Sequence, residues 1–332
     1  MQPKDLDKLK RLCDTVDLNY RVTRMYATYL ERFPEIITRD IIDEICDGDI
    51  DKKEAIVALL CELFALNTEE VAEDRRIARE YISESVRLLD AKRYTENKYY
   101  KNITIPEVKD GGWEFKREHY PPYRAVICDD LLIKNDFREI PPLGFFEEEF
   151  TFPAVLEDGN EWMTLTPVDL DTSDEAIAAA HGKVITFGLG LGYYTYMCSE
   201  KDEVESITVV EKSENVIRLF EKYILPQFSH PEKVEIINAD AFYYAEFDMP
   251  EESYDVAFVD TWRDASDGTP MYVRMKGLEH LSPNTKFIYW IENFLISRER
   301  ALRFDKLTNL VESGDDSAPR SFDEFVKELT KR

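Results

Sequence analysis

The chain has 332 residues, with 42 Lys and Arg against 68 Asp and Glu, which gives a formal net charge of −26 at pH 7. So acidic a surface repels the phosphates of nucleic acids and the anionic leaflet of membranes, and no basic cluster along the chain is large enough to reverse this. Hydrophobic residues make up 44% of the chain, which is typical of a globular protein. We therefore expect a folded, acidic protein without nucleic-acid or membrane partners.

The cysteines and histidines are too scattered for a disulfide framework or a zinc site. The sequence does not begin with the apolar segment of a secretory signal, and no apolar run approaches the roughly 18 residues that span a bilayer. We expect reduced thiols, a cytoplasmic location and no bound metal. The residues concerned are Cys13, Cys46, Cys61, Cys128, Cys198, His119, His181, His230 and His280.

Residues 1–95 are predicted to form a helical N-terminal region of about five helices. Apolar residues recur there at intervals of three and four, first over 6–16 and last over 77–89. Breaks are expected at Phe33-Pro34, at Asp47-Gly48-Asp49 and at Asn67-Thr68, the last opening a helix with Glu69 and Glu70 in its first turn. If the protein forms a homodimer, we expect this region to supply the interface.

Residues 96–167 are predicted to form a β-rich connecting or cap segment. Stretches such as 101–105 and 150–152 alternate in polarity and are rich in β-branched or aromatic residues. Turn residues separate these stretches. The turn pairs are Gly111-Gly112, Pro121-Pro122, Pro141-Pro142 and Asp158-Gly159.

Residues 168–332 alternate between apolar strands and helices, which indicates an α/β domain with a mostly parallel sheet covered on both faces. Thr172 to Glu175 has the pattern of a capping box opening a helix at Ala176, and Gly182 is expected to close that helix. After Ile291 only helices are predicted, over 292–310 and 321–329. The predicted strands are 183–187, 206–210, 234–238, 256–259 and 286–291, and the predicted helices between them start at 193, 213 and 271.

A glycine loop, Gly188-Leu189-Gly190-Leu191-Gly192, follows the first of these strands and opens the helix from Tyr193. Glycines let a backbone turn tightly and approach a ligand, and a helix N-terminus offers free N–H donors. The next strand ends in Glu211, 23 residues after Gly188, where a carboxylate can accept hydrogen bonds from both ribose hydroxyls. This spacing favours a ligand that contains a nucleoside.

Two further strand ends carry acids. Asp240 follows the third strand, where a carboxylate can accept a hydrogen bond from an adenine amino group, and Phe242 is close enough to cover the base. Asp260 follows the fourth strand. In open α/β sheets ligands lie over the carboxyl ends of the strands, so the glycine loop and the three acids are expected to surround one ligand.

Residues 172–292 resemble the class I S-adenosylmethionine-dependent methyltransferase family, which has a Rossmann-like, doubly wound fold. Gly188, Gly190 and Gly192 match the family's loop, Glu211 its ribose acid and Asp240 its adenine contact. The resemblance implies that S-adenosylmethionine is the cofactor and that its methyl group is transferred in line to an unidentified small-molecule or protein acceptor. The implied cofactor-binding residues are Gly188, Leu189, Gly190, Gly192, Glu211, Lys212, Asp240, Ala241 and Asp260.

The sequence departs from this family at two places. Thr186 occupies the position of an acid that many members place two residues before the first glycine. The fourth strand ends in Asp260-Thr261-Trp262, where amino-group methylases of nucleic acids have Asn/Asp-Pro-Pro-Tyr, so methylation of a base is disfavoured. The sixth and seventh antiparallel strands usual in the family have no counterpart in the predicted elements.

Asp260 is the best candidate for contact with the substrate or its proton, although it could instead anchor the loop that follows. Aromatic rings near the loop could present their faces to a sulfonium cation. A strand over 161–167 could lie along the methionine end of the cofactor. The substrate-pocket candidates are Trp162, Thr164, Tyr193, Tyr194 and Trp262.

Other activities remain open. An aminopropyltransferase of the spermidine synthase type shares the fold and would use Asp260 as a base, but its loop carries an Asp where this chain has Leu191. A nicotinamide dehydrogenase is disfavoured because Tyr193 occupies the place of the third glycine of its loop. The third alternative is a non-catalytic protein that binds a nucleoside cofactor and acts through its N-terminal half.

Overall fold

The computed structural model describes residues 1–46 and 50–331, so the break predicted at Asp47-Gly48-Asp49 lies outside the described residues. The chain divides into two compact units, each built from segments distant in sequence. This division differs from the three consecutive regions 1–95, 96–167 and 168–332 that the sequence predicts. The first unit comprises Met1–Leu88, Tyr123–Phe145 and Asn293–Arg332, and the second comprises Leu89–Pro122 and Phe146–Glu292.

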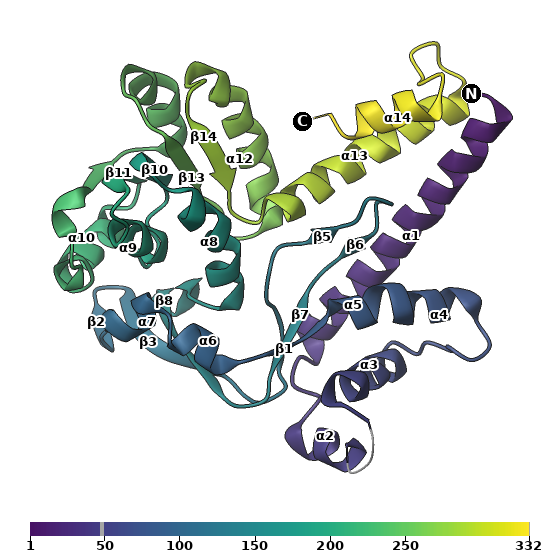
Figure 1. The fold of residues 1–332 in the computed structure, drawn as a ribbon, viewed down its shortest axis with the longest axis horizontal. Helices are drawn as coiled ribbons and strands as arrows, with labels where there is room; N and C mark the ends of the chain where they lie inside the picture. Colours follow the sequence, from purple (N-terminus) through teal and green to yellow (C-terminus); the bar gives the residue numbers. More distant parts are fainter. Residues whose placement is uncertain (47–49, 332) are drawn as a thin grey trace. The chain divides into compact units, whose positions relative to one another are not determined.

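The first unit is mainly helical (Figure 1). Its longest helix is α1, which buries a stripe of apolar side chains, including Val22 and Tyr26. Its helices are α1 (Pro3–Arg32), α2 (Arg39–Ile45), α3 (Lys52–Leu63), α4 (Ala72–Ile77), the π-helix η1 (Ala78–Ile82), α5 (Ser83–Ser85), α13 (Glu292–Ser313) and α14 (Phe322–Leu329). The strands β1 (Val86–Leu89), β7 (Leu143–Phe146) and β4 (Ala125–Ile127) form a sheet in that order, and β5 (Leu132–Ile133) pairs with β6 (Glu139–Ile140).

The helices α13 and α14 belong to this unit because they pack against α1. Phe304 of α13 and Phe325 of α14 pack with Leu9 and Leu12 of α1 in one apolar cluster. Asp130 accepts hydrogen bonds from the backbone N–H groups of the first turn of α13, as a capping carboxylate does. Burial nevertheless raises the pKa of Asp130 to about 6.

Two sequence predictions for the first unit are wrong in detail. Glu69 and Glu70 lie in a turn rather than in a helix, because the side chain of Asn67 accepts a hydrogen bond from the N–H of Glu70. The helix α4 begins only at Ala72. Residues 86–89 form the strand β1 although their apolar spacing also suits a helix, and Val86 is buried in the core of the unit.

The second unit begins with a layer of short helices and an antiparallel sheet. The strands of this sheet have the order β2–β3–β8–β9, and β3 pairs with β8 along its whole length. Its elements are α6 (Ala91–Thr95), α7 (Lys98–Asn102), β2 (Val108–Asp110), β3 (Trp113–Tyr120), β8 (Phe150–Glu157) and β9 (Asn160–Thr164).

A five-stranded sheet follows, with the order β12–β11–β10–β13–β14 and all of its strands parallel. Since right-handed crossovers run first one way and then the other from β10, helices cover both faces (Figure 1). The chain therefore has a mixed α/β fold with a Rossmann-like sheet. The strands are β10 (Gly182–Phe187), β11 (Val204–Glu211), β12 (Val234–Asn238), β13 (Val256–Val259) and β14 (Lys286–Tyr289).

Capping residues mark where the connecting helices begin. Ser213 caps α10, which begins where predicted, but α8 begins before the predicted capping box and α12 begins at Ala265 rather than near 271. Thr172 and Ser173 lie inside α8 and donate their hydroxyls to carbonyls one turn back. The connections are α8 (Pro167–Ala179), α9 (Tyr193–Ser199), α10 (Glu214–Tyr223), η2 (Leu225–Gln227), η3 (Pro231–Lys233), α11 (Ala241–Tyr243), η4 (Tyr244–Asp248), η5 (Met249–Glu251), α12 (Ala265–Leu278) and η6 (Glu279–Leu281).

Two of these boundaries correct the sequence prediction. The capping box of α8 is formed by Thr166 and Asp169. Gly182 does not close α8, which ends at Ala179 with Ala180 as its C-cap; Gly182 opens β10 with a φ of +57° and leaves room for the carboxylate of Asp255. In the part of the chain that the structure describes, no helix is long and apolar enough to cross a bilayer.

Candidate active site

The glycine loop lies between β10 and α9, and its shape requires glycine. Gly188 has a φ of +101°, and a Cβ at this position would overlap the backbone carbonyl of Asp260 at the end of β13. Gly192 has a φ of +75° at the N-cap of α9, and a Cβ there would overlap the ring of Phe220. The loop therefore passes so close to its neighbours that its glycines are needed for packing as well as for backbone conformation.

Gly190 is covered by Met163 of β9. A Cβ on Gly190 would overlap the sulfur of Met163, and the N–H of Leu191 donates a hydrogen bond to this sulfur at 3.1 Å. Thr186, at the end of β10, donates its hydroxyl to the carbonyl of Gly188 at 3.3 Å. The two side chains help to hold the loop in one conformation.

Glu211 joins the glycine loop to β11. Its side chain accepts a hydrogen bond from the N–H of Leu189 at 3.2 Å and another from the N–H of Ser213 at 2.8 Å, and the residue is only 6% exposed. Each oxygen of the carboxylate thus has one backbone donor. Because a carboxylate can accept about four hydrogen bonds, one lone pair on each oxygen is left for a ligand.

Asp260 lies beside two other carboxylates. Burial, together with the negative charges of Asp169 and Glu211, raises the pKa of Asp260 to about 8. Burial also raises the pKa of Asp169 to about 6, although Thr166 donates two hydrogen bonds to that carboxylate. Glu211 and Asp260 therefore lie at the glycine loop, with Asp169 near enough to Asp260 to raise its pKa, and this negative charge favours a ligand that carries positive charge.

The residues after Asp260 present polar atoms without partners. The hydroxyl of Thr261 and the indole N–H of Trp262 are buried, and neither makes a hydrogen bond to a described residue. The Trp262 ring stacks on Tyr289, at the end of the neighbouring strand β14, with 6.4 Å between the ring centroids. Buried polar groups without partners are rare, and here they lie next to the acidic cluster.

Asp240 and its neighbours lie at the end of β12. Asp240 is exposed, and its Oδ1 accepts the N–H groups of Phe242 and Tyr243, so it caps α11 and keeps Oδ2 for a ligand. Phe242 is buried and its ring faces the guanidinium of Arg274 at 4.2 Å. Ala241 is buried, and Lys212 is exposed with its backbone carbonyl accepting from Asn238.

Tyr193 and Tyr194 are placed in packing roles. Tyr194 packs on Phe258 of β13, with 4.4 Å between the ring centroids. The hydroxyl of Tyr193 accepts a hydrogen bond from Asn97 of the α7 region, and its ring contacts Tyr99. Of the five predicted pocket candidates, Trp262 is the one that lies two residues from Asp260 in the chain.

The α7 region also holds the glycine loop. The hydroxyl of Tyr99, which is 1% exposed, donates to the backbone carbonyl of Leu191, and Asn102 donates to the hydroxyl of Tyr196 at 2.7 Å. Together with the bond from Asn97 to Tyr193, these contacts fasten both the end of the loop and the first turns of α9.

We expect Tyr99→Phe to lower the free energy of unfolding by about 1–3 kcal/mol, because the carbonyl of Leu191 would stay buried without a donor. Urea unfolding of the full chain followed by circular dichroism measures this change. Tyr20→Phe is the control, since Tyr20 is 72% exposed and should tolerate the loss of its hydroxyl. Equal stability of the two variants would show that the bond to Leu191 does not support the loop.

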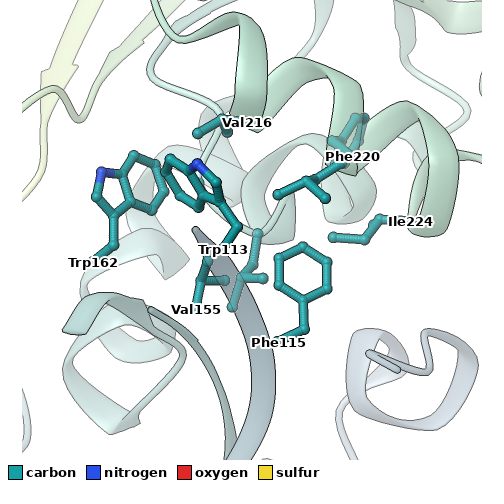
Figure 2. A pocket seen from close by; sticks show the side chains of 10 residues that line it. Trp113, Phe115, Val155, Trp162, Val216, Phe220 and Ile224 are labelled. Carbon is teal, nitrogen blue, oxygen red and sulfur yellow. The ribbon is translucent and has the colours of Figure 1, made fainter. Parts of the chain in front are cut away.

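Trp162 and Thr164 both lie on β9. Thr164 pairs with Ala154 of β8. Trp162 meets Trp113 edge to face, with 5.3 Å between the ring centroids, at a small hollow between β3, β8, β9 and α10 (Figure 2). Gly190 and Leu191 also line this hollow, whose lining includes no charged side chain. The hollow therefore has an apolar lining and offers no acid or base.

Asp169 is the residue of the site that sequence reasoning missed. The pattern Thr-x-x-Asp at Thr166–Asp169 is a second possible capping box, six residues before the one that was predicted. This pattern places Asp169 in the first turn of α8. Among the described residues there is no group of three or more His, Cys, Asp or Glu side chains arranged to hold a metal ion.

Comparison with known structures gives a weak likeness. The structure is similar to the crystal structure of spermidine synthase from Thermotoga maritima, with 22% sequence identity and a TM-score of 0.26, over 36% of this chain and 44% of that chain. The match thus spans less than half of that enzyme's length. No protein-family model matches the sequence, and no curated protein matches it either.

Proposed function

We propose that the second unit binds S-adenosylmethionine and transfers its methyl group to a small-molecule or protein acceptor. The observation that carries this proposal is the placement of Glu211 and Asp260 at a glycine loop at the carboxyl end of a parallel sheet, with the charge of Asp169 acting on Asp260. Ligands of such sheets lie at this edge. A cationic nucleoside derivative satisfies both the geometry and the charge of the site.

The side chains fit this cofactor group by group. Glu211 has one unused lone pair on each oxygen for the two ribose hydroxyls. Asp240 retains Oδ2 for the adenine amino group. Asp260 and Asp169 provide negative charge for the sulfonium, and the free indole N–H of Trp262 is a donor for an oxygen of either substrate.

When bound, S-adenosylmethionine supplies a methyl group on a sulfonium, and the C–S electron pair leaves with sulfur as the acceptor's nucleophile bonds to the methyl carbon. The protein aligns the two reactants in line and excludes water. Asp260 accepts the proton that an amine or hydroxyl acceptor releases, and it must be ionised to do so. The positive charge of the cofactor would lower the pKa of Asp260 from about 8, so that the carboxylate is ionised and can accept this proton.

Aminopropyl transfer is the second candidate. Decarboxylated S-adenosylmethionine has no carboxylate and carries one ammonium in addition to the sulfonium, so its net positive charge matches a cluster of three acids well. Burial and two carboxylates raise the pKa of Asp260, and no positively charged side chain is among the causes. A ligand with two positive charges would therefore meet negative charge that no side chain of the protein offsets at Asp260. Against this candidate stands Leu191, because a leucine cannot bind an ammonium.

Glu211→Ala is expected to weaken cofactor binding by about 1.5–3 kcal/mol, or roughly 10- to 200-fold, because it removes hydrogen bonds to a charged acceptor. Isothermal titration calorimetry of the full chain measures this with S-adenosylmethionine, S-adenosylhomocysteine, decarboxylated S-adenosylmethionine and NAD. Glu205→Ala on the same strand is the control, since Glu205 is exposed.

The same titrations separate the candidates. Preference for S-adenosylmethionine supports methyl transfer, and preference for its decarboxylated form supports aminopropyl transfer. Binding without turnover of any amine, hydroxyl or protein acceptor would support the non-catalytic alternative. If none of the four ligands binds, the proposed activity is wrong, and if Glu211→Ala binds as tightly as the wild type, the proposed site is wrong.

A further inference from the structure

The first unit contains an apolar groove that is independent of the acidic site. It has a volume of about 250 Å³ and lies between α3 and the segment that leads into α2. Two of its apolar side chains are well exposed, Ile36 at 43% and Leu63 at 41%. The groove is lined by Ile36, Ile37, Ile41, Leu59, Glu62 and Leu63.

Carboxylates without partners lie in the wall of this groove and on α2, the helix that supplies Ile41 to it. Glu62 lies in its wall, and Asp40, Asp43 and Glu44 are exposed on α2, where Arg39 is the basic residue. None of the four acids has a side-chain hydrogen bond or ion pair to another described residue, whereas Glu73 and Glu35, which are also exposed, are each paired with an arginine. The groove thus combines an apolar floor with uncompensated negative charge.

We infer that this groove is a docking site for a cationic amphipathic helix of another protein. Such a helix would place aliphatic side chains at intervals of three and four residues between Ile36, Leu59 and Leu63. Its lysines or arginines would face Glu62 and the acids of α2. Complementary charge of this kind raises the association rate and selects the partner.

A second copy of the chain is a poorer occupant. Each copy carries a net charge of −26, so two copies repel one another, and the groove's own acids would face more acids. The charges around this groove therefore do not favour it as the interface of the homodimer that was expected through the N-terminal region. The helix of a basic partner removes the repulsion and covers the exposed Ile36 and Leu63.

The probe is a fluorescently labelled amphipathic peptide of about 18 residues made of Leu and Lys, compared with a matched peptide in which Glu replaces every Lys. Fluorescence anisotropy with the full chain should show that the Lys peptide binds at least about tenfold more tightly. Glu62→Lys and Leu63→Ser should each weaken this binding by about tenfold. The controls Glu205→Lys and Leu302→Ser, both at exposed positions of the described chain, should change it less than about twofold.

Hydrogen exchange gives a second readout that does not depend on the variants. The Lys peptide should protect backbone amides of residues 36–45 and 59–63. Equal effects of the groove and control substitutions, or protection elsewhere only, would mean that the peptide binds the acidic surface at large, and the inference would be overturned. It would also be overturned if sedimentation showed a dimer that Leu63→Ser dissociates, because a second copy would then be the occupant.

Discussion

Asp260→Asn is expected to reduce the rate of methyl transfer by about 10²- to 10⁴-fold, the usual contribution of a positioned proton acceptor. The amide keeps the shape of the side chain but cannot accept a proton. The loss should appear mainly in kcat, with little change in the affinity for S-adenosylhomocysteine, which carries no sulfonium charge. Single-turnover assays with a radiolabelled methyl group measure the rate, and calorimetry measures the affinity.

The pH dependence of kcat/KM tests most directly whether Asp260 is the base. Because burial raises the pKa of Asp260 to about 8, kcat/KM of the wild type should rise with pH through about 8. The positive charge of the bound cofactor favours the ionised carboxylate, so the midpoint of kcat should lie at a lower pH. A flat profile in the wild type, or an unchanged rate in Asp260→Asn, would exclude Asp260 as the base. Asp202→Asn, at an exposed turn, is the control.

The same ionisation affects stability in a defined direction. At pH values between about 4 and 8 Asp260 is protonated in the folded protein and ionised in the unfolded chain, so the folded state binds more protons. The contribution of this carboxyl to the free energy of unfolding therefore falls as the pH rises from about 4 to about 8 and is level above 8. Asp260→Asn should lack this part of the pH dependence.

Gly188→Ala is expected to cost about 3 kcal/mol or more and to abolish cofactor binding. Alanine is disfavoured at a φ of +101°, and its Cβ would overlap the backbone carbonyl of Asp260, which cannot move without displacing the end of β13. Thermal unfolding measures the stability, and calorimetry measures the binding. Both should change together, because the loop and the acid share one contact.

Gly277→Ala provides the matched control. Gly277 lies within α12, and a Cβ there would meet no atom within 4 Å. Alanine should therefore stabilise the protein by about 0.5–1 kcal/mol through its higher helix propensity. If Gly188→Ala were as stable as Gly277→Ala, the close approach of the loop to β13 would not be required for folding.

The regular part of the fold could be predicted from the sequence. The strands expected over 234–238 and 256–259 coincide with β12 and β13, because short buried apolar runs bounded by turns leave little freedom in where a strand begins. Local signals failed where two patterns compete. Residues 86–89 suit a helix or a strand, and their pairing with β7 decides in favour of the strand. Thr166 and Thr172 both begin a capping pattern, and Asp169 binds the first.

The candidate site shows the same limit. Glu211 and Asp260 could be placed from sequence because each ends a strand of the parallel sheet, whose carboxyl ends share one edge. The neighbourhood of Asp169 could not, since it depends on how α8 packs against that edge. Tyr193 and Tyr194 directly follow the loop in sequence, but their rings point to Tyr99 and Phe258.

The contacts of the α7 region have a consequence for how the protein can be divided. Asn97, Tyr99 and Asn102 bond to residues more than 90 positions further along the chain, all of them in the loop or in α9. A shortened chain that began at residue 168 would contain the whole five-stranded sheet and yet lose all three bonds. The Rossmann-like sheet of this protein is therefore not an exchangeable module, and a chimera that keeps the cofactor loop needs residues 97–102 as well.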